Sequence, residues 1–335
     1  MIRSDVNQVR GALTLLPALV LLGASGCLFT GGQAGRAKPS FTLPERVEVR
    51  ELSSRSSRVG GLAFSEEGVL FFANHLELGT IGRHAVAEEE AEAETFIDLN
   101  EWMTAYEDRA PQAHGICLDA KGGLLAAEVG TGKVIRISAD ASKLEVLADF
   151  YDGTLLGNVW DVAVGPDGDV YASSPNSGVV YRIRPGDGFV GVVNDELVRA
   201  CGLAVSPDGA RLVAAEPDAG RVVVFDLGVD DETAEAWTLV DFSATGEEPS
   251  GLVFDESGRL YVAMGDTGKV RVFDLEKGAL LRTYDAGGEA EFLAYRDGAL
   301  YVSGGSSFRG MHLRPEARFR KLGRLLKKEP GEEGD

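Results

Sequence analysis

Six side chains that could bind a ligand or transfer a proton stand at matching places in the chain. An imidazole beside two carboxylates could hold a transition metal, so His114, Glu128 and Glu216 are candidates for a divalent metal site. His114 could instead act as a general base that Glu128 orients. The indole of Trp160 could stack on a sugar or another ring. The complete set of candidates is Asn74, His114, Glu128, Trp160, Cys201 and Glu216.

A unit that occurs six times sets the position of these residues. Each copy has an apolar segment, a polar turn that closes on glycine, and a second apolar segment. The opening residue and the closing glycine are seven positions apart in every copy. The pairs are Gly61 and Gly68, Gly115 and Gly122, Asp161 and Gly168, Gly202 and Gly209, Gly251 and Gly258, and Glu291 and Gly298.

Each copy predicts a β-hairpin followed by further strands. Pro-Asp-Gly and Glu-Ser-Gly are turn sequences in which glycine can take a positive φ. Successive copies begin 54, 46, 41, 49 and 40 residues apart, which suits one four-stranded blade per copy. The sequence therefore predicts an all-β, six-bladed β-propeller of antiparallel blades over residues 41–313. Four copies continue into a β-branched or aromatic third strand, at 133–137, 179–183, 221–225 and 269–273.

The last copy lacks one strand. After Gly298 only about one strand remains, around 311–313. Residues 46–52 alternate apolar and polar side chains and could supply the missing outer strand, which would close the ring and remove an unpaired sheet edge. Two stacked smaller domains are the competing interpretation, but no change of composition interrupts the repeats.

The candidate residues should meet at one end of the propeller. The second strand of a hairpin returns to the end at which the first strand begins. His114, Trp160 and Cys201 precede first strands, and the other candidates end second strands. We therefore expect all six to surround one axial mouth, where a small molecule or a protein could bind. Structural roles are equally open: Trp160 could plug the mouth, Cys201 could be an apolar filler, and the two glutamates could be solvated rim carboxylates.

Composition excludes some classes of protein. The 335 residues include 33 Lys and Arg against 53 Asp and Glu, a formal net charge of -20. Nucleic acids are excluded as partners, because phosphate contacts need clustered basic side chains. Three cysteines cannot build a disulfide framework.

The first residues predict export. Arg3 and Arg10 precede an apolar stretch over 12–22, followed by small residues. The stretch Ala24-Ser25-Gly26-Cys27 resembles a bacterial lipobox, which implies cleavage before Cys27 and a lipid anchor on that residue. Residues 1–26 would be the signal peptide, residues 27–40 a flexible tether, and residues 314–335 a charged tail. The alternative is an ordinary secretory signal.

A lipid anchor places the mature protein in the cell envelope. Leu28 rather than Asp follows Cys27, and by what is known of lipoprotein sorting this favours the outer membrane of a Gram-negative cell. The expected localisation is therefore extracytoplasmic, with contact to a membrane through the anchor.

The copies resemble the SMP-30/gluconolactonase and NHL-repeat families of six-bladed propellers, roughly over residues 58–313. The stretch 114–137 is the closest to a blade of such lactonases. The resemblance implies a central divalent cation, usually calcium, held by Glu, Asn, Asn and Asp, each just before the opening residue of an inner strand. In this chain the six positions just before the opening residues hold no Glu, Asn or Asp. They are Gly60, His114, Trp160, Cys201, Ser250 and Ala290.

Two main hypotheses follow for function. The first is a lipid-anchored propeller that binds a small molecule or a protein at its axial face. The alternative is a metal-dependent hydrolase of lactones or esters, of the gluconolactonase type but with altered metal ligands. A metal-independent lyase, similar to streptogramin lyase, is a third. Calcium requires oxygen donors, and the expected Glu, Asn, Asn and Asp ligands are missing. The sequence therefore favours the binding hypothesis over the calcium-dependent hydrolase.

Overall fold

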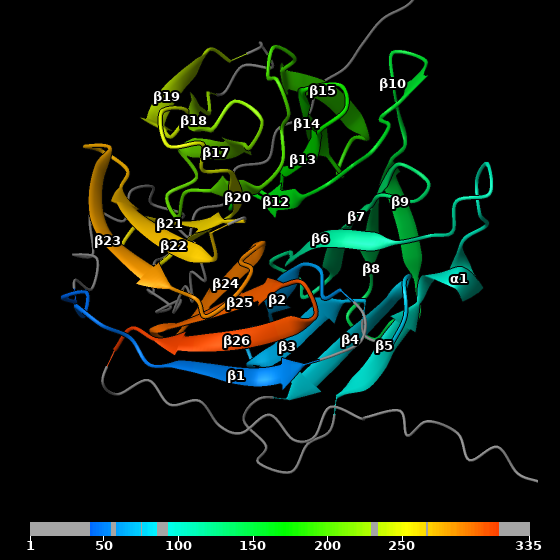
Figure 1. Cartoon of the computed structure of the whole chain (residues 1–335). Coiled ribbons are helices and arrows are strands. Elements are labelled where there is room, and N and C mark those ends of the chain that lie inside the picture. Colours follow the sequence, from blue (N-terminus) through cyan, green and yellow to red (C-terminus); the bar gives the residue numbers. More distant parts are fainter. Residues whose placement is uncertain are drawn as a thin grey trace, which may run out of the picture. The chain divides into compact units, whose positions relative to one another are not determined.

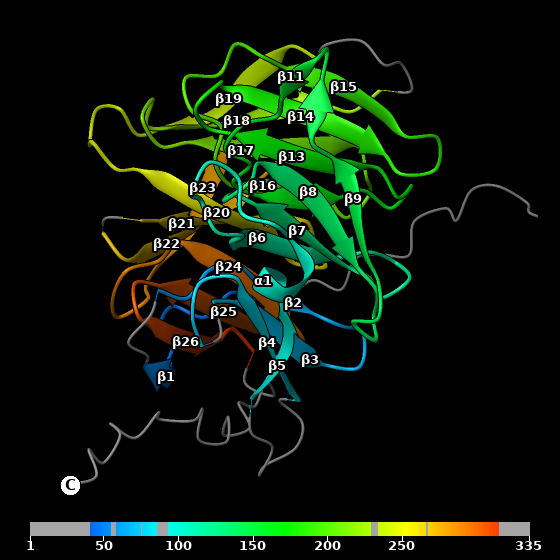
Figure 2. The same cartoon turned by 90° about the vertical axis from the view of Figure 1, so that its right-hand side faces the viewer.

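The computed structural model describes residues 41–54, 58–74, 76–85, 93–228, 234–265 and 267–314. Almost all regular structure in these ranges is β-strand, and the single helix, α1 (Leu99–Trp102), is one turn long. Six antiparallel four-stranded sheets follow one another around a common centre (Figure 1), and Figure 2 shows the same blades from the side. The predicted all-β, six-bladed propeller is confirmed.

The blades follow the predicted repeats, each running from an inner to an outer strand. The first blade contains β2 (Leu62–Phe64), β3 (Val69–Ala73), β4 (Thr80–Ala85) and β5 (Glu94–Asp98). The second contains β6 (Ala113–Leu118), β7 (Leu124–Glu128), β8 (Lys133–Ile137) and β9 (Leu144–Ala148). The third contains β12 (Val162–Val164), β13 (Val170–Ser174), β14 (Val179–Arg184) and β15 (Phe189–Asn194). A small hairpin, β10 (Phe150–Tyr151) with β11 (Thr154–Leu155), lies between the second and third blades.

The remaining three blades complete the ring. The fourth blade contains β16 (Leu203–Val205), β17 (Arg211–Glu216), β18 (Arg221–Asp226) and β19 (Ala236–Asp241). The fifth contains β20 (Pro249–Phe254), β21 (Arg259–Met264), β22 (Lys269–Asp274) and β23 (Ala279–Asp285). The sixth contains β24 (Phe292–Arg296), β25 (Ala299–Gly304), β26 (Ser307–His312) and β1 (Val49–Ser54).

An N-terminal strand closes the ring, as the sequence predicted. β1 pairs antiparallel with β26, and Val49 lies opposite Met311. The strand covers 49–54 rather than 46–52, because pairing starts only where β26 offers a partner. The register shifts at a bulge between Glu51 and Ser53, after which pairing continues to Ser307, the first residue of β26.

Hairpin turns and inter-blade packing explain why this sequence folds in this way. The six closing glycines have φ between 72° and 91°, a region that side chains with a Cβ rarely adopt. Six apolar clusters each fill the space between two neighbouring blades. In one of them Phe71 of the first blade packs with Ile116 and Leu124 of the second. Each blade is thus buried on both faces, which the nearly continuous apolar residues of middle strands such as β7 and β17 allow.

The meander of each blade gives the propeller two distinct ends. The axial face is the end at which the inner strands begin, and it carries the connections between blades. The turn face is the opposite end, which carries the turns that close on glycine. At the turn face the Phe41 ring lies between the guanidinium groups of Arg259 and Arg314. The ring centroid is 3.9 Å from Cζ of Arg259 and 4.1 Å from Cζ of Arg314. The chain therefore enters the propeller at its turn face.

The predicted signal peptide, Cys27 and the tether lie outside the described residues, as does the tail beyond Arg314. Within the described ranges, no helix has the length and apolar character that a membrane crossing requires.

Candidate functional site

Neighbouring inner strands come into hydrogen-bond contact at the axial face. The backbone N–H of Gly61 donates to the carbonyl oxygen of His114 at 2.7 Å, and that of Gly115 donates to the carbonyl oxygen of Trp160 at 3.0 Å. A Cβ on Gly61 would lie 2.6 Å from that His114 oxygen. These opening positions are therefore glycine because the backbones approach so closely. The contacts fix His114 and Trp160 on a rigid ring around the axis.

His114 and Trp160 form an aromatic contact at this ring, with their ring planes tilted by 45°, and we call this pair the His114–Trp160 stack. Their ring centroids are 3.7 Å apart, and the Phe292 ring lies 4.8 Å from the imidazole, edge to face. Nδ1 of His114 lies 3.1 Å from the carbonyl oxygen of Trp160. Because a carbonyl only accepts, Nδ1 carries the proton and Nε2 keeps its lone pair. Burial lowers the pKa of His114 to about 4, although the bond to Trp160 opposes this, so the imidazole is neutral at pH 7.

Two further polar groups adjoin the stack. A Cβ on Gly60 would lie 3.4 Å from Nδ2 of Asn74 and 3.2 Å from the carbonyl oxygen of His114, so both groups border Gly60. Oδ1 of Asn74 is buried and makes no hydrogen bond within the described structure. Arg58 forms an ion pair with Glu291, and the positive charge of Arg58 helps to lower the pKa of His114. Asn74, His114 and Trp160 thus lie at the same end of the propeller, and Arg58 lies with them.

Cys201 lies at the same ring, but the residue is only 3% exposed. Its carbonyl oxygen accepts a hydrogen bond from Oγ of Ser173 at 2.6 Å, and Ser173 in turn accepts the N–H of Asp161 at 3.1 Å. Burial raises the pKa of the Cys201 thiol to about 12. The thiol is therefore protonated at neutral pH and a poor nucleophile or ligand.

The structure does not bring Glu128 to the mouth. Its side chain is fully buried and accepts the backbone N–H groups of Gln112, Gly130 and Thr131 at 2.7, 2.9 and 2.9 Å. The hydroxyl of Thr131 donates a further hydrogen bond to it. Glu128 therefore organises the turn between β7 and β8 and joins it to the connection that leads into β6. These bonds leave little capacity for orienting His114.

Glu216 has the equivalent role in the fourth blade. It is also fully buried, and it accepts the N–H of Val198 at 2.7 Å and Nε of Arg221 at 2.5 Å. In both blades the glutamate accepts a backbone N–H from the connection that leads into the inner strand, from Gln112 for Glu128 and from Val198 for Glu216. Neither carboxylate converges with His114.

Asp161 was not among the sequence candidates, although it lies on the axis. It occupies the opening position that is glycine in four copies. Its Oδ1 accepts the N–H of Val162 and its Oδ2 accepts the N–H of Leu203, both at 2.9 Å. The side chain lies so close to the second blade that a Cβ on Gly115 would be 1.9 Å from Oδ1. The replacement of a repeated glycine by a carboxylate was the signal that could have identified it.

The residues at the axial face do not fit the calcium that the fold family implies. The six positions among which oxygen ligands were expected hold Gly60, His114, Trp160, Cys201, Ser250 and Ala290. Among the described residues, no group of three or more His, Cys, Asp or Glu side chains is arranged to hold a metal ion. Hard cations need several oxygen donors. No metal-dependent step can therefore be derived from these residues.

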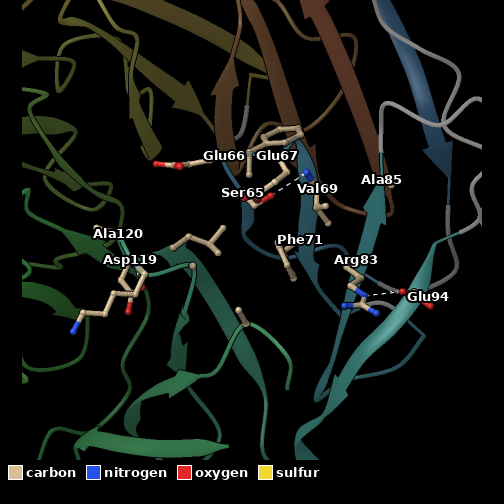
Figure 3. A pocket seen from close by; sticks show the side chains of 15 residues that line it. Ser65, Glu66, Glu67, Val69, Phe71, Arg83, Ala85, Glu94, Asp119 and Ala120 are labelled. Carbon is tan, nitrogen blue, oxygen red and sulfur yellow. Dashed lines mark hydrogen bonds and ion pairs between the residues drawn. The ribbon is translucent and has the colours of Figure 1, made fainter. Parts of the chain in front are cut away.

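Two hollows lie away from the His114 stack. The larger, about 940 Å³, lies at the turn face between the first two blades. Figure 3 shows Arg83 paired with Glu94 on one wall and Asp119 on another, and Asp119 is itself paired with Arg136. The second hollow, about 360 Å³, is the channel along the axis, and the inner strands of all six blades line it.

Comparison with known proteins agrees with the fold. Residues 140–291 match the family model of the SMP-30/Gluconolactonase/LRE-like region. A gluconolactonase of Zymomonas mobilis is 23% identical over 178 residues, which are 46% of this chain and 50% of that protein. The chain thus spans about half the length of this curated relative.

Solved structures share the whole propeller. A gluconolactonase from Xanthomonas campestris is 22% identical with a TM-score of 0.66, over 80% of this chain and 90% of that one. A calcium-binding regucalcin from Agrobacterium tumefaciens is 16% identical with a TM-score of 0.63, over 85% and 99% of the two chains. The chain is therefore a six-bladed β-propeller, and its residues 140–291 are similar to the SMP-30/Gluconolactonase/LRE-like region.

Proposed function

We propose that this propeller is a metal-independent binding protein whose axial face docks a protein partner. The observation that carries the proposal is the replacement of the expected oxygen ligands by the neutral His114–Trp160 stack. A mouth built from aromatic rings in contact offers apolar surface and one imidazole lone pair, which suit recognition better than Lewis-acid chemistry.

The surroundings of the stack support a protein as the partner. Of the ten large apolar side chains that are exposed in the described residues, seven belong to axial-face connections. Clustered exposed apolar side chains, especially aromatic ones, are typical of protein interfaces. We call this set the apolar rim: Leu76, Leu78, Trp102, Tyr106, Phe150, Tyr151 and Val198.

The proposal includes the lipid anchor at Cys27 in the bacterial envelope. Phe41, held at the turn face, follows Cys27 by 14 residues, a span of at most about 50 Å when extended.

Site-specific photo-cross-linking tests this proposal. A benzophenone amino acid at Phe150, which is 50% exposed in the rim, should give an adduct of discrete mass in cells. The matched control is Val146, which is 43% exposed on the outer strand β9 and should give none. Trp102→Ser in the same rim should reduce the yield at Phe150. Equal adducts at both sites, or none at Phe150, would contradict a docking role.

Hydrolysis of lactones is the second candidate, and the similarity to gluconolactonases favours it. Nε2 of His114 would be the base that activates water, since it is the available acceptor at the mouth. A stoichiometric metal together with lactone hydrolysis lost in His114→Gln would establish this candidate in place of the first.

A further inference from the structure

The axial channel is closed at the axial face and open at the turn face. Along β2, β12 and β16 the first two residues are buried and the third is partly exposed. At the closed end the backbones of neighbouring inner strands are in contact, and His114 and Trp160 lie beyond them. The channel volume of about 360 Å³ falls within the usual range of small-molecule sites, roughly 300–1,000 Å³.

A single carboxylate stands at the closed end. Asp161 lines the channel and is 7% exposed. No Lys, Arg or His is among the residues that line the channel. A buried charge without a partner is costly, and burial accordingly raises the pKa of Asp161 to about 7. The carboxylate of Asp161 thus has no positively charged side chain beside it among the residues that line the channel.

The bonds that Asp161 makes leave room for such a counter-ion. Each carboxylate oxygen accepts one backbone N–H, from Val162 and from Leu203, and so retains a free lone pair. The inner strands are edge strands of their sheets, so backbone carbonyl groups on the axis side add acceptors. The remainder of the lining is largely aliphatic, including Ile116, Leu203 and Leu252.

We propose that the channel is a binding site for a small organic cation, a primary ammonium on a short apolar stem, which enters from the turn face and pairs with Asp161. An ammonium has three donors, which match the two free carboxylate lone pairs and a strand carbonyl. The stem would then lie against the aliphatic walls. This site is independent of the axial face and of any partner bound there.

Calorimetric titration of the full chain with n-butylammonium chloride tests the proposal, with 1-butanol as the uncharged control. Butylammonium should bind and butanol should bind at least tenfold more weakly. Asp161→Asn should weaken butylammonium binding at least tenfold, whereas Glu291→Gln, at the equivalent position of the sixth copy, should leave it unchanged. Binding that is equal in Asp161→Asn, or absent from the unsubstituted protein, would overturn the proposal.

A second variant keeps the test valid if Asp161→Asn does not fold. Val205→Trp narrows the channel near its turn-face opening and leaves Asp161 in place. It should abolish butylammonium binding without changing the circular dichroism spectrum. Unchanged binding in a folded Val205→Trp protein would place the cation elsewhere and would overturn the proposal.

Discussion

The carboxylate of Asp161 in the third blade accepts the backbone N–H of Leu203 in the fourth at 2.9 Å. This bond crosses between blades at the point where the inner strands converge. Elsewhere on the ring, backbone or hydroxyl groups make the corresponding links, as Ser303 does to the carbonyl oxygen of Gly60 at 2.8 Å. A charged group thus holds one blade junction that could have been held by a neutral one.

The first prediction concerns this carboxylate and pH. The pKa of Asp161 is about 7 in the folded protein, against 3.8 for the free side chain. Its contribution to stability is therefore greatest below pH 3.8 and is lost as the pH rises to 7. The difference corresponds to about 4 kcal/mol at about 1.4 kcal/mol per unit. Urea unfolding from pH 4 to 7 should show this loss in the unsubstituted protein relative to Asp161→Asn, and parallel curves would contradict it.

His114 should have the opposite dependence. Burial lowers its pKa from 6.5 to about 4, so the neutral imidazole stabilises the fold above pH 6.5, and this contribution is lost as the pH falls towards 4. Compared with His114→Gln, the unsubstituted protein should lose stability on acidification over that window. The same urea series measures it. An imidazole that titrates near 6.5 by NMR would contradict the burial that we describe.

The third prediction separates structural from functional carboxylates. Glu128→Ala would leave three buried N–H groups without an acceptor, at about 1–3 kcal/mol each, so we expect a loss of at least about 3 kcal/mol in unfolding free energy. Glu145→Ala is the matched control, since Glu145 is exposed and pairs only with Lys143 at 3.2 Å. A Glu128→Ala protein of normal stability would contradict the structural role.

A fourth prediction tests the close approach of the inner strands. Gly61→Ala would place its Cβ 2.6 Å from the carbonyl oxygen of His114 and 2.7 Å from the backbone nitrogen of Ile116, and neither backbone atom can easily move. We expect severe destabilisation, seen as a large drop in Tm or as insolubility. Gly186→Ala, with no heavy atom within 4 Å of the new Cβ, should change stability by less than about 0.5 kcal/mol. Similar Tm values for the two variants would show that the ring is looser than described.

The fifth prediction concerns the anchor. Cys27→Ala should release the protein from the membrane fraction and prevent labelling by a radioactive fatty acid, because the proposed acyl chains provide the membrane affinity. Fractionation of cells that express each form measures this. Membrane association that persists in Cys27→Ala without label would contradict the lipoprotein proposal.

Much of the fold could be predicted because the repeat encodes it locally. Turn glycines such as Gly168 and third strands such as β18 follow from spacing and residue type alone. The site could be predicted only in part. The sequence placed Glu128 and Glu216 at the correct ends of their strands, but it could not show that neighbouring N–H groups, and for Glu216 the Arg221 guanidinium, occupy their oxygens. Asp161 was not recognised as a candidate because it occupies the opening position of the repeat, which holds a structural glycine in four other copies.

The central claim is that the axial face functions without a metal. Inductively coupled plasma mass spectrometry on the full chain, purified without chelator and assayed against a panel of lactones, tests it most directly. We predict less than about 0.1 equivalent of any divalent metal, since the described residues offer no donor cluster, and no hydrolysis above background with or without added calcium. One tightly bound equivalent of metal, accompanied by lactone hydrolysis that a chelator abolishes, would contradict the claim.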